Sequence, residues 1–236
     1  MNKALLIGLI GLLAPTLFAA ESEPQAKVAT ATRQLGDKPN YGWTTNIRDG
    51  GSNPVEHPPI VGKTDKSGLI CLRFMNGGIP SEVYMNGQKG TVGGPTVWRT
   101  FDEVAKSGGF AAGVVGMLRS WKTPVAEATD LLGKVKNVKE VDGVMSGELN
   151  ADAAKPLLEF IAPTFQGQAP PKIADPEGSV KFWIQDGMLK KYELSIQGRV
   201  IRGDQESQAS RTTLVEVKNI GTTKLEVPEE AKQKLL

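Results

Sequence analysis

Turn dipeptides divide much of this chain into short apolar runs, and this pattern limits the available folds more than any other feature. Asn76-Gly77 and Asn86-Gly87 each separate two such runs, and Asp142-Gly143 and Asp186-Gly187 do the same further along. Tight hairpin turns favour these dipeptides because their central positions need a positive φ. The pattern therefore predicts antiparallel strands that follow one another as hairpins.

The predicted strands lie before and after a central helical region. Val180, Phe182 and Ile184 fall on one side of their strand, and Lys181 and Gln185 fall on the other. Such alternation implies a sheet with one covered face and one face in water. Strands are expected over residues 41–47, 68–75, 79–85, 88–92, 134–141, 144–149, 179–185, 188–196 and 211–218, with a short one around Leu225.

Helices are expected where capping residues precede apolar residues at helical spacing. Thr100 and Glu103 fit a capping box, whereas Thr123-Pro124 fits a cap with a first-turn proline and Gly133 fits a stop. Pro156 disfavours one of the helices. The helices are expected over residues 24–35, 110–121, 124–132 and 152–161 and from Thr100 and Pro228, with loops over 50–59 and 163–176. Strands with helices packed on one face make an α+β fold.

The first twenty residues have the composition of a secretory signal peptide. Lys3 precedes residues 4–18, which carry no charge, and Ala19-Ala20 supplies the small residues of a cleavage site. The apolar run is shorter than the ~20 residues of a spanning helix and contains Pro15, which disfavours an uncleaved anchor. We expect cleavage near Ala20, within Ala19 to Ser22, and a periplasmic location. Residues 21–236 are expected to form one domain with no transmembrane segment.

The chain has a single cysteine, Cys71. One cysteine cannot form an intramolecular disulfide, and its position is far from the end of the apolar N-terminal run, where a lipid-anchor cysteine would lie. Cys71 is flanked by Ile70 and Leu72 and follows Leu69, which predicts a buried, unreactive thiol. The domain is therefore expected to depend on its own hydrophobic core.

Several functional classes are disfavoured by the charged residues and motifs. The 28 basic and 26 acidic residues are interspersed, which argues against nucleic acid as a partner. The single histidine, His57, lies in a proline-rich loop, so we expect no metal site, no cofactor and no catalytic residue. Gly62-Lys63-Thr64 lacks the upstream glycine of a phosphate loop, and Arg202-Gly203-Asp204 is interpreted as a plain turn. An enzyme of unrecognised type is the least favoured class.

Large apolar residues are the more informative feature. Such residues usually fill a core, and that is the simpler interpretation for each of them. The alternative is a gap between a curved sheet and its covering helices, which would form an apolar ligand cavity. Gly113 and Gly116 would keep part of the helical cover thin or mobile. The candidate ligand-binding residues are Phe74, Trp98, Val114, Met117, Leu118, Val180, Phe182, Ile184, Tyr192, Leu194 and Ile196.

The order of elements and the C-terminal half resemble the LolA-like lipoprotein-carrier superfamily, and within it the LppX/LprG branch. Residues 179–194, SVKFWIQDGMLKKYEL, resemble the signature hairpin of that branch. Residues 212–217, 219–222 and 225–228 resemble its closing strands, and 142–149 also fits. The resemblance covers most of residues 21–236. The LppX/LprG members are usually lipid-anchored, and the corresponding cysteine has no counterpart here.

This resemblance implies a strongly curved antiparallel sheet, an incomplete β-barrel, with helices covering its concave face. It also implies a hydrophobic cavity that carries lipids or the acyl chains of a lipoprotein towards the outer membrane, with an envelope membrane protein as a further partner. The competing interpretation is a non-catalytic envelope module that binds another protein through a sheet edge or groove. Since fold does not fix function, both remain hypotheses at this point.

Overall fold

A computed structural model describes residues 23–51, 54–94, 97–162 and 169–235. The strands are β1 (Asn40–Gly50), β2 (Val55–Glu56), β3 (Ile60–Asp65), β4 (Ile70–Asn76), β5 (Ile79–Asn86), β6 (Lys89–Gly93), β7 (Trp98–Thr100), β8 (Val135–Val141), β9 (Val144–Leu149), β10 (Lys172–Gln185), β11 (Met188–Arg202) and β12 (Gln205–Lys218). The helices are α1 (Glu23–Gly36), α2 (Phe101–Ala105), α3 (Gly109–Arg119), α4 (Pro124–Leu132), α5 (Ala151–Ile161) and α6 (Glu229–Leu235).

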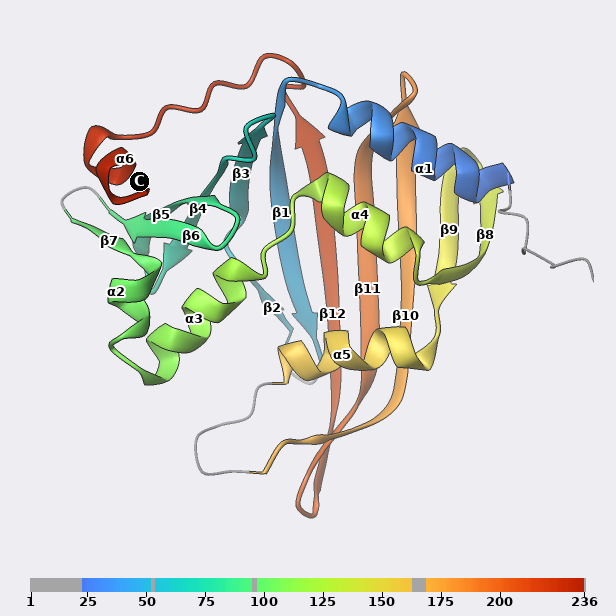
Figure 1. Cartoon of the computed structure of the whole chain (residues 1–236). Coiled ribbons are helices and arrows are strands. Elements are labelled where there is room, and N and C mark those ends of the chain that lie inside the picture. Colours follow the sequence, from blue (N-terminus) through green and yellow to red (C-terminus); the bar gives the residue numbers. More distant parts are fainter. Residues whose placement is uncertain (1–22, 52–53, 95–96, 163–168, 236) are drawn as a thin grey trace, which may run out of the picture.

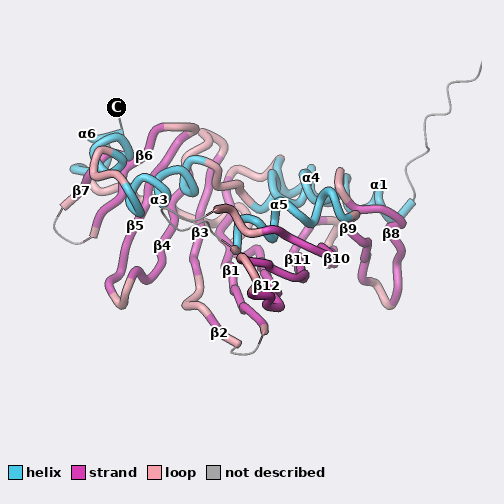
Figure 2. Tube along the Cα trace, turned by 90° about the horizontal axis from the view of Figure 1, so that it is seen from below, coloured by secondary structure: helices cyan, strands magenta, loops and turns pink. Residues whose placement is uncertain are grey.

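All strands of the described chain pair in one open antiparallel sheet. Its order is β7-β6-β5-β4-β3-β1-β12-β11-β10-β9-β8, and β2 adds to β1. Helices α1, α4 and α5 lie across one face of the long central strands, whereas α2 and α3 lie near the β7 end (Figure 1). Figure 2 shows these helices together on one side of the sheet. The predicted α+β class, with an incomplete barrel and helices on one face, is confirmed.

The hydrophobic core lies between the central strands and these helices. Val180, Phe182 and Tyr192 of the β10–β11 hairpin are at most 1% exposed and pack in one cluster with Val28 and Leu35 of α1. The register pairs Phe182 with Tyr192 and Val180 with Leu194, which places these side chains on the same face. The predicted alternation of β10 therefore sets which face is covered.

A smaller cluster lies on the opposite face of the sheet near its β7 end. Cys71 and Tyr84 pack there beneath Ala231 of α6. The alternate residues Leu72 and Val83 face the main core, so the two faces of β4 and β5 are both covered. The Tyr84 hydroxyl donates to the backbone oxygen of Glu226, which fixes the segment before α6. The prediction of a buried Cys71 is confirmed.

The hairpin turns fall where the dipeptides indicate, although two are displaced by one residue. Asn76 pairs with Ile79, so the loop is Gly77-Gly78, and both glycines have positive φ. Asn86 pairs with Lys89, so this loop begins at Gly87, φ 59°. In both cases the asparagine ends the strand, because the glycine already supplies the required conformation.

Several further details differ from the sequence prediction. Strands β2, β3 and β7 were not predicted, because they are short and lack clear alternation, and β12 begins at Gln205 rather than at residue 211. The strand expected around Leu225 is wrong: residues 219–228 form no strand, and Leu225 packs against the second cluster. Part of the predicted loop 163–176 belongs to β10, which begins at Lys172 and accommodates Pro176 at an irregularity in its register.

The helix predictions hold. Thr100 and Glu103 form the predicted capping box of α2, and Thr123 caps α4 by accepting a hydrogen bond from the backbone of Ala126. Asn150 caps α5, which continues through Pro156 because the ring lies on the exposed side of the helix. The Gly203-Asp204 turn joins β11 and β12, as expected for Arg202-Gly203-Asp204. Polar capping residues therefore mark the starts of α2, α4 and α5.

Replacing Gly62 with alanine should destabilise the fold. A Cβ atom there would lie 2.0 Å from Cε2 of Trp43, which packs directly on the glycine. We expect a loss of about 1–3 kcal/mol in the free energy of unfolding, measured by urea denaturation. The matched control is Gly113→Ala in α3, where a Cβ has open space and should stabilise by about 0.5–1 kcal/mol. Equal stabilities for the two variants would contradict the described packing.

Candidate functional site

The structure brings nine of the predicted ligand-binding residues into one apolar layer between sheet and helices. Six belong to the main core and three are half-buried against it. Those in the core are Leu118, Val180, Phe182, Tyr192, Leu194 and Ile196, and those at its margin are Phe74, Val114 and Ile184. These side chains pack against one another and against α1, α3, α4 and α5. That they line a ligand cavity stays a prediction.

Two predicted residues lie elsewhere. Trp98 packs on Tyr84, with ring centroids 5.4 Å apart, and belongs to the cluster beneath α6. It therefore faces away from the apolar layer. Met117 is half-buried on α3 and belongs to neither cluster. Sequence alone could not separate these residues from the others, because apolar character does not say which face of the sheet a side chain meets.

A polar pair joins α4 to the apolar layer. The Tyr192 hydroxyl on β11 donates a hydrogen bond to Oε2 of Glu127 on α4. Burial raises the pKa of Glu127 above its ordinary value, although the hydrogen bond from Tyr192 opposes this effect. Burial also raises the pKa of Tyr192 well above that of a free tyrosine. The tyrosine therefore stays protonated and remains a donor.

Glu127 was not predicted to belong to this layer. An acidic residue in the first turns of a helix usually faces solvent and favours the positive end of the helix dipole. The available signal was its spacing: Glu127 lies three residues after Pro124 and four before Leu131, and both of these are buried. That spacing places all three on one face of α4.

A charged cluster lies near one end of this layer. Arg211 of β12 pairs in register with the buried Ile196 and thus shares the face that meets the helices. Its Nε and Nη2 donate to the two oxygens of Asp49 at 2.6 and 2.9 Å. The His57 ring nitrogen Nε2 lies 2.8 Å from Asp49 Oδ2. The hydrogen bond from Arg211 lowers the pKa of Asp49, although desolvation partly opposes it.

The helical cover is uneven. Figure 1 shows the last turn of α5 over the end of β1, whereas the first turn of α3 lies beside α2, towards β7. Phe110 in that turn of α3 is 84% exposed, and Phe160 in that turn of α5 is 58% exposed. Leu157 and Ile161 of α5 are half-buried against the core. Apolar residues therefore reach solvent at these two helix ends.

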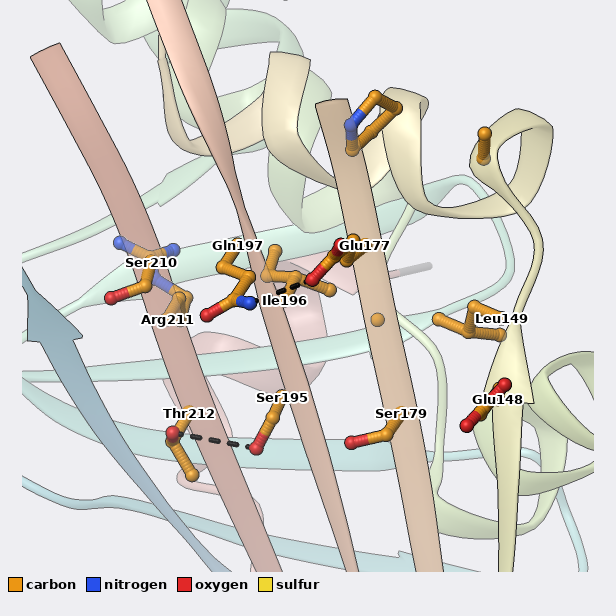
Figure 3. A pocket seen from close by; sticks show the side chains of 13 residues that line it. Glu148, Leu149, Glu177, Ser179, Ser195, Ile196, Gln197, Ser210, Arg211 and Thr212 are labelled. Atoms are coloured by element: carbon orange, nitrogen blue, oxygen red, sulfur yellow. Dashed lines mark hydrogen bonds between the residues drawn. The ribbon is translucent and has the colours of Figure 1, made fainter. Parts of the chain in front are cut away.

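A hollow of about 780 Å³ lies on the opposite face of the central strands. Thr212, Ser195, Ser179 and Glu148 form a row across β12, β11, β10 and β9, and Gln197 and Glu177 lie beside it (Figure 3). Ser195 and Thr212 hydroxyls are 3.5 Å apart, and Gln197 Nε2 donates to Glu177 at 2.8 Å. Most of the lining is polar, although Leu149 and Ile196 also contribute, so the hollow suits an acyl chain poorly. It is the solvent face that the strand alternation predicts.

Metal sites and membrane-spanning helices are two other features that a chain of this kind can contain. Among the described residues, no group of three or more His, Cys, Asp or Glu side chains could hold a metal ion. Within the same ranges, no helix is long and apolar enough to cross a membrane. The two features that stand out are therefore the apolar layer with its polar pair and the charged cluster near its end.

Comparisons with known proteins identify solved structures of similar fold. No protein-family model matches the sequence, and no curated protein matches it. LprF from Mycobacterium bovis is 12% identical over 89% of this chain and 97% of its own, with a TM-score of 0.44. The lipoprotein LppX from Mycobacterium tuberculosis is 13% identical over 88% and 100%, with a TM-score of 0.45. A LolA superfamily protein from Nitrosomonas europaea is 10% identical over 86% and 94%, with a TM-score of 0.34.

LppX and the LolA superfamily are the proteins that the sequence itself resembles. At these identities and TM-scores, the similarity concerns the arrangement of strands and helices and carries no information about ligand or activity.

Replacing Asp49 with asparagine should destabilise the protein in a pH-dependent way. Because the folded-state pKa of Asp49 is lowered, its ionised form stabilises the fold above its ordinary pKa of 3.8, and this is lost as the pH falls through the lowered value. We expect a deficit of about 1–3 kcal/mol at pH 7 that shrinks towards zero in acid, measured by urea denaturation. The exposed Asp204→Asn is the control, and a deficit that does not depend on pH would contradict the prediction.

Proposed function

We propose that this protein binds and carries lipids or the acyl chains of lipoproteins in the apolar layer between its sheet and helices, without catalysis. The observation that carries the proposal is the uneven cover of this layer. Helices α1 and α4 cross its centre, whereas Val114 of α3 and Leu157 and Ile161 of α5 are only half-buried against it. An apolar surface that is nearly but not fully closed suits a ligand that enters lengthwise.

The energetics favour such a ligand. Transfer of an acyl chain out of water contributes about 0.8 kcal/mol per CH₂, so each CH₂ group that apolar side chains cover adds to the binding free energy. Phe110 of α3 and Phe160 of α5 are exposed. They provide apolar contacts for a chain before it reaches the buried residues.

The charged cluster fits a ligand with a polar end. Asp49, Arg211 and His57 lie on β1, on β12 and between β2 and β3, at the margin of the apolar layer. An amphiphile places its apolar chain among apolar side chains and its polar group near water and hydrogen-bonding partners. The layer and the cluster together provide both environments.

Export of the protein is part of the proposal. The predicted signal peptide, residues 1–20, lies outside the described residues, and the periplasmic location follows from it. Intact-mass measurement of protein from the native envelope should give an N-terminus within Ala19 to Ser22. A mass that includes Met1 to Phe18 would contradict cleavage.

A second candidate function is an envelope module that binds another protein. The β4–β5 hairpin favours it, because Met75 and Ile79 beside its turn are 44% and 66% exposed. Exposed apolar residues beside one another on a hairpin are typical of interaction sites. A stoichiometric protein partner whose binding is lost in Ile79→Ser, with no lipid in the purified protein, would favour this candidate.

Native mass spectrometry of the gently purified protein should detect bound lipid, and a fluorescent fatty acid should bind to the delipidated protein. Phe110→Ser and Phe160→Ser should each slow uptake of the probe severalfold, because they remove apolar contacts at the first turn of α3 and the last turn of α5. Val141→Ser is the matched control: Val141 is 61% exposed at the end of β8, the edge strand of the sheet. Protein without lipid and without probe binding would contradict the carrier function.

A further inference from the structure

Helix α4 is held to the sheet by a side-chain hydrogen bond as well as by apolar packing. Tyr192 is 1% exposed on β11, beside Phe182 at 6.5 Å between ring centroids, and its hydroxyl donates to Glu127 of α4. The bond thus joins the helix to the middle of the apolar layer. Figure 1 shows α4 crossing in front of the central strands at this level.

A second tyrosine lies near the start of the same helix. Tyr41 on β1 is 5% exposed; burial raises the pKa of its hydroxyl, whereas the nearby Thr123 side chain and Val125 backbone lower it. Thr123 is the cap of α4. The start of α4 therefore lies close to a second tyrosine of the covered sheet face.

Apolar packing accounts for the rest of the attachment. Pro124, Ala128, Leu131 and Leu132 are the buried residues of α4, which packs along α1. The helix has nine residues, and a helix of this length needs tertiary contacts to persist in water. Loss of the hydrogen bond between Tyr192 and Glu127 should therefore make α4 open more often.

We propose that α4 is a lid over the apolar layer and that the Glu127 carboxyl, held against the sheet by Tyr192, is its proton-dependent latch. The role as a lid rests on the proposed function, because it presumes a ligand beneath the helix. The latch itself does not depend on that function.

The charged groups around Glu127 set the direction of the pH effect. Burial raises the pKa of Glu127, and Asp130 on the next turn also raises it, whereas Tyr192 from β11 and Lys122 before the helix lower it. Helix α1 adds no titratable group, because the residues it buries are Val28, Ala31, Thr32 and Leu35. Tyr41 of β1 acts on Tyr192 and not on the direction of the Glu127 shift.

The closed lid therefore favours the protonated form of Glu127. An open lid returns this carboxyl to water and to its ordinary pKa. The closed state is consequently most stable below that ordinary pKa and loses stability as the pH rises through the higher pKa of the closed state, because an ionised Glu127 is costly to bury even though it still accepts from Tyr192. Acid should close the lid, and alkaline conditions should loosen it.

Hydrogen exchange of the lipid-free protein measures this opening directly. Exchange of residues 124–132, corrected for the intrinsic effect of pH, should accelerate severalfold from pH 5 to pH 8 in the wild-type protein. Glu127→Gln should remove this dependence and stay protected, because an uncharged amide oxygen still accepts from Tyr192. Tyr192→Phe should exchange roughly fivefold faster at low pH, since one buried hydrogen bond is lost.

Two controls make the outcome decisive. Glu230→Gln changes an exposed carboxyl on α6 and should retain the wild-type profile, while protection of residues 188–202 reports that each variant is folded. Corrected exchange of α4 that is independent of pH, or an unchanged pH dependence in Glu127→Gln, would overturn the latch. A pH-dependent α4 in a protein that binds no lipid would overturn the lid and the carrier function but leave the latch intact.

Discussion

The contact on which the rest of the structure depends is the packing of the β10–β11 hairpin against the helices above it. Val180, Phe182 and Tyr192 are almost fully buried there, and they share one face because side chains alternate along a strand. A shift of one residue in register would move all of them to the polar face. Glycines at two positions allow the close fit: a Cβ at Gly178 would lie 2.8 Å from Leu149 Cδ1, and one at Gly198 would lie 2.7 Å from Leu158 Cδ1.

This packing divides the sheet into two surfaces of opposite character. The face that meets the helices is apolar from β10 towards β4, whereas the other face of the long strands carries hydroxyl, amide and carboxylate groups around an open hollow. Only the first surface can exclude water from a hydrocarbon chain. The short helices do not cover it evenly, and Phe110 of α3 and Phe160 of α5 remain exposed.

Two polar groups within this apolar surface differ in how they respond to protons. The hydrogen bond from Arg211 lowers the pKa of Asp49, so this carboxylate stays ionised at neutral pH. Burial acts in the opposite direction on Glu127, which favours the neutral carboxyl beneath α4. The balance between desolvation and a nearby cation decides the two cases. The margin of the layer thus has a permanent charge pair, and its cover has a group that can lose a proton.

The sequence by itself determined most of the elements, because turn dipeptides, caps and alternation act over a few residues. It placed the hairpins, the caps at Thr100 and Thr123, and the apolar face of β10. It could not place β3 or β7, whose short runs gain their strand form from neighbours far along the chain.

Only the tertiary structure decided which apolar residues meet and what lies among them. Trp98 has the same chemistry as its fellow candidates but lies on the other face of the sheet, beneath α6. Glu127 has the sequence position of a surface residue on a helix, and its half-buried position is set by its contact with Tyr192, which lies 65 residues away in the chain. Local pattern fixes the direction of a side chain within its own element, whereas burial depends on which other elements pack above it.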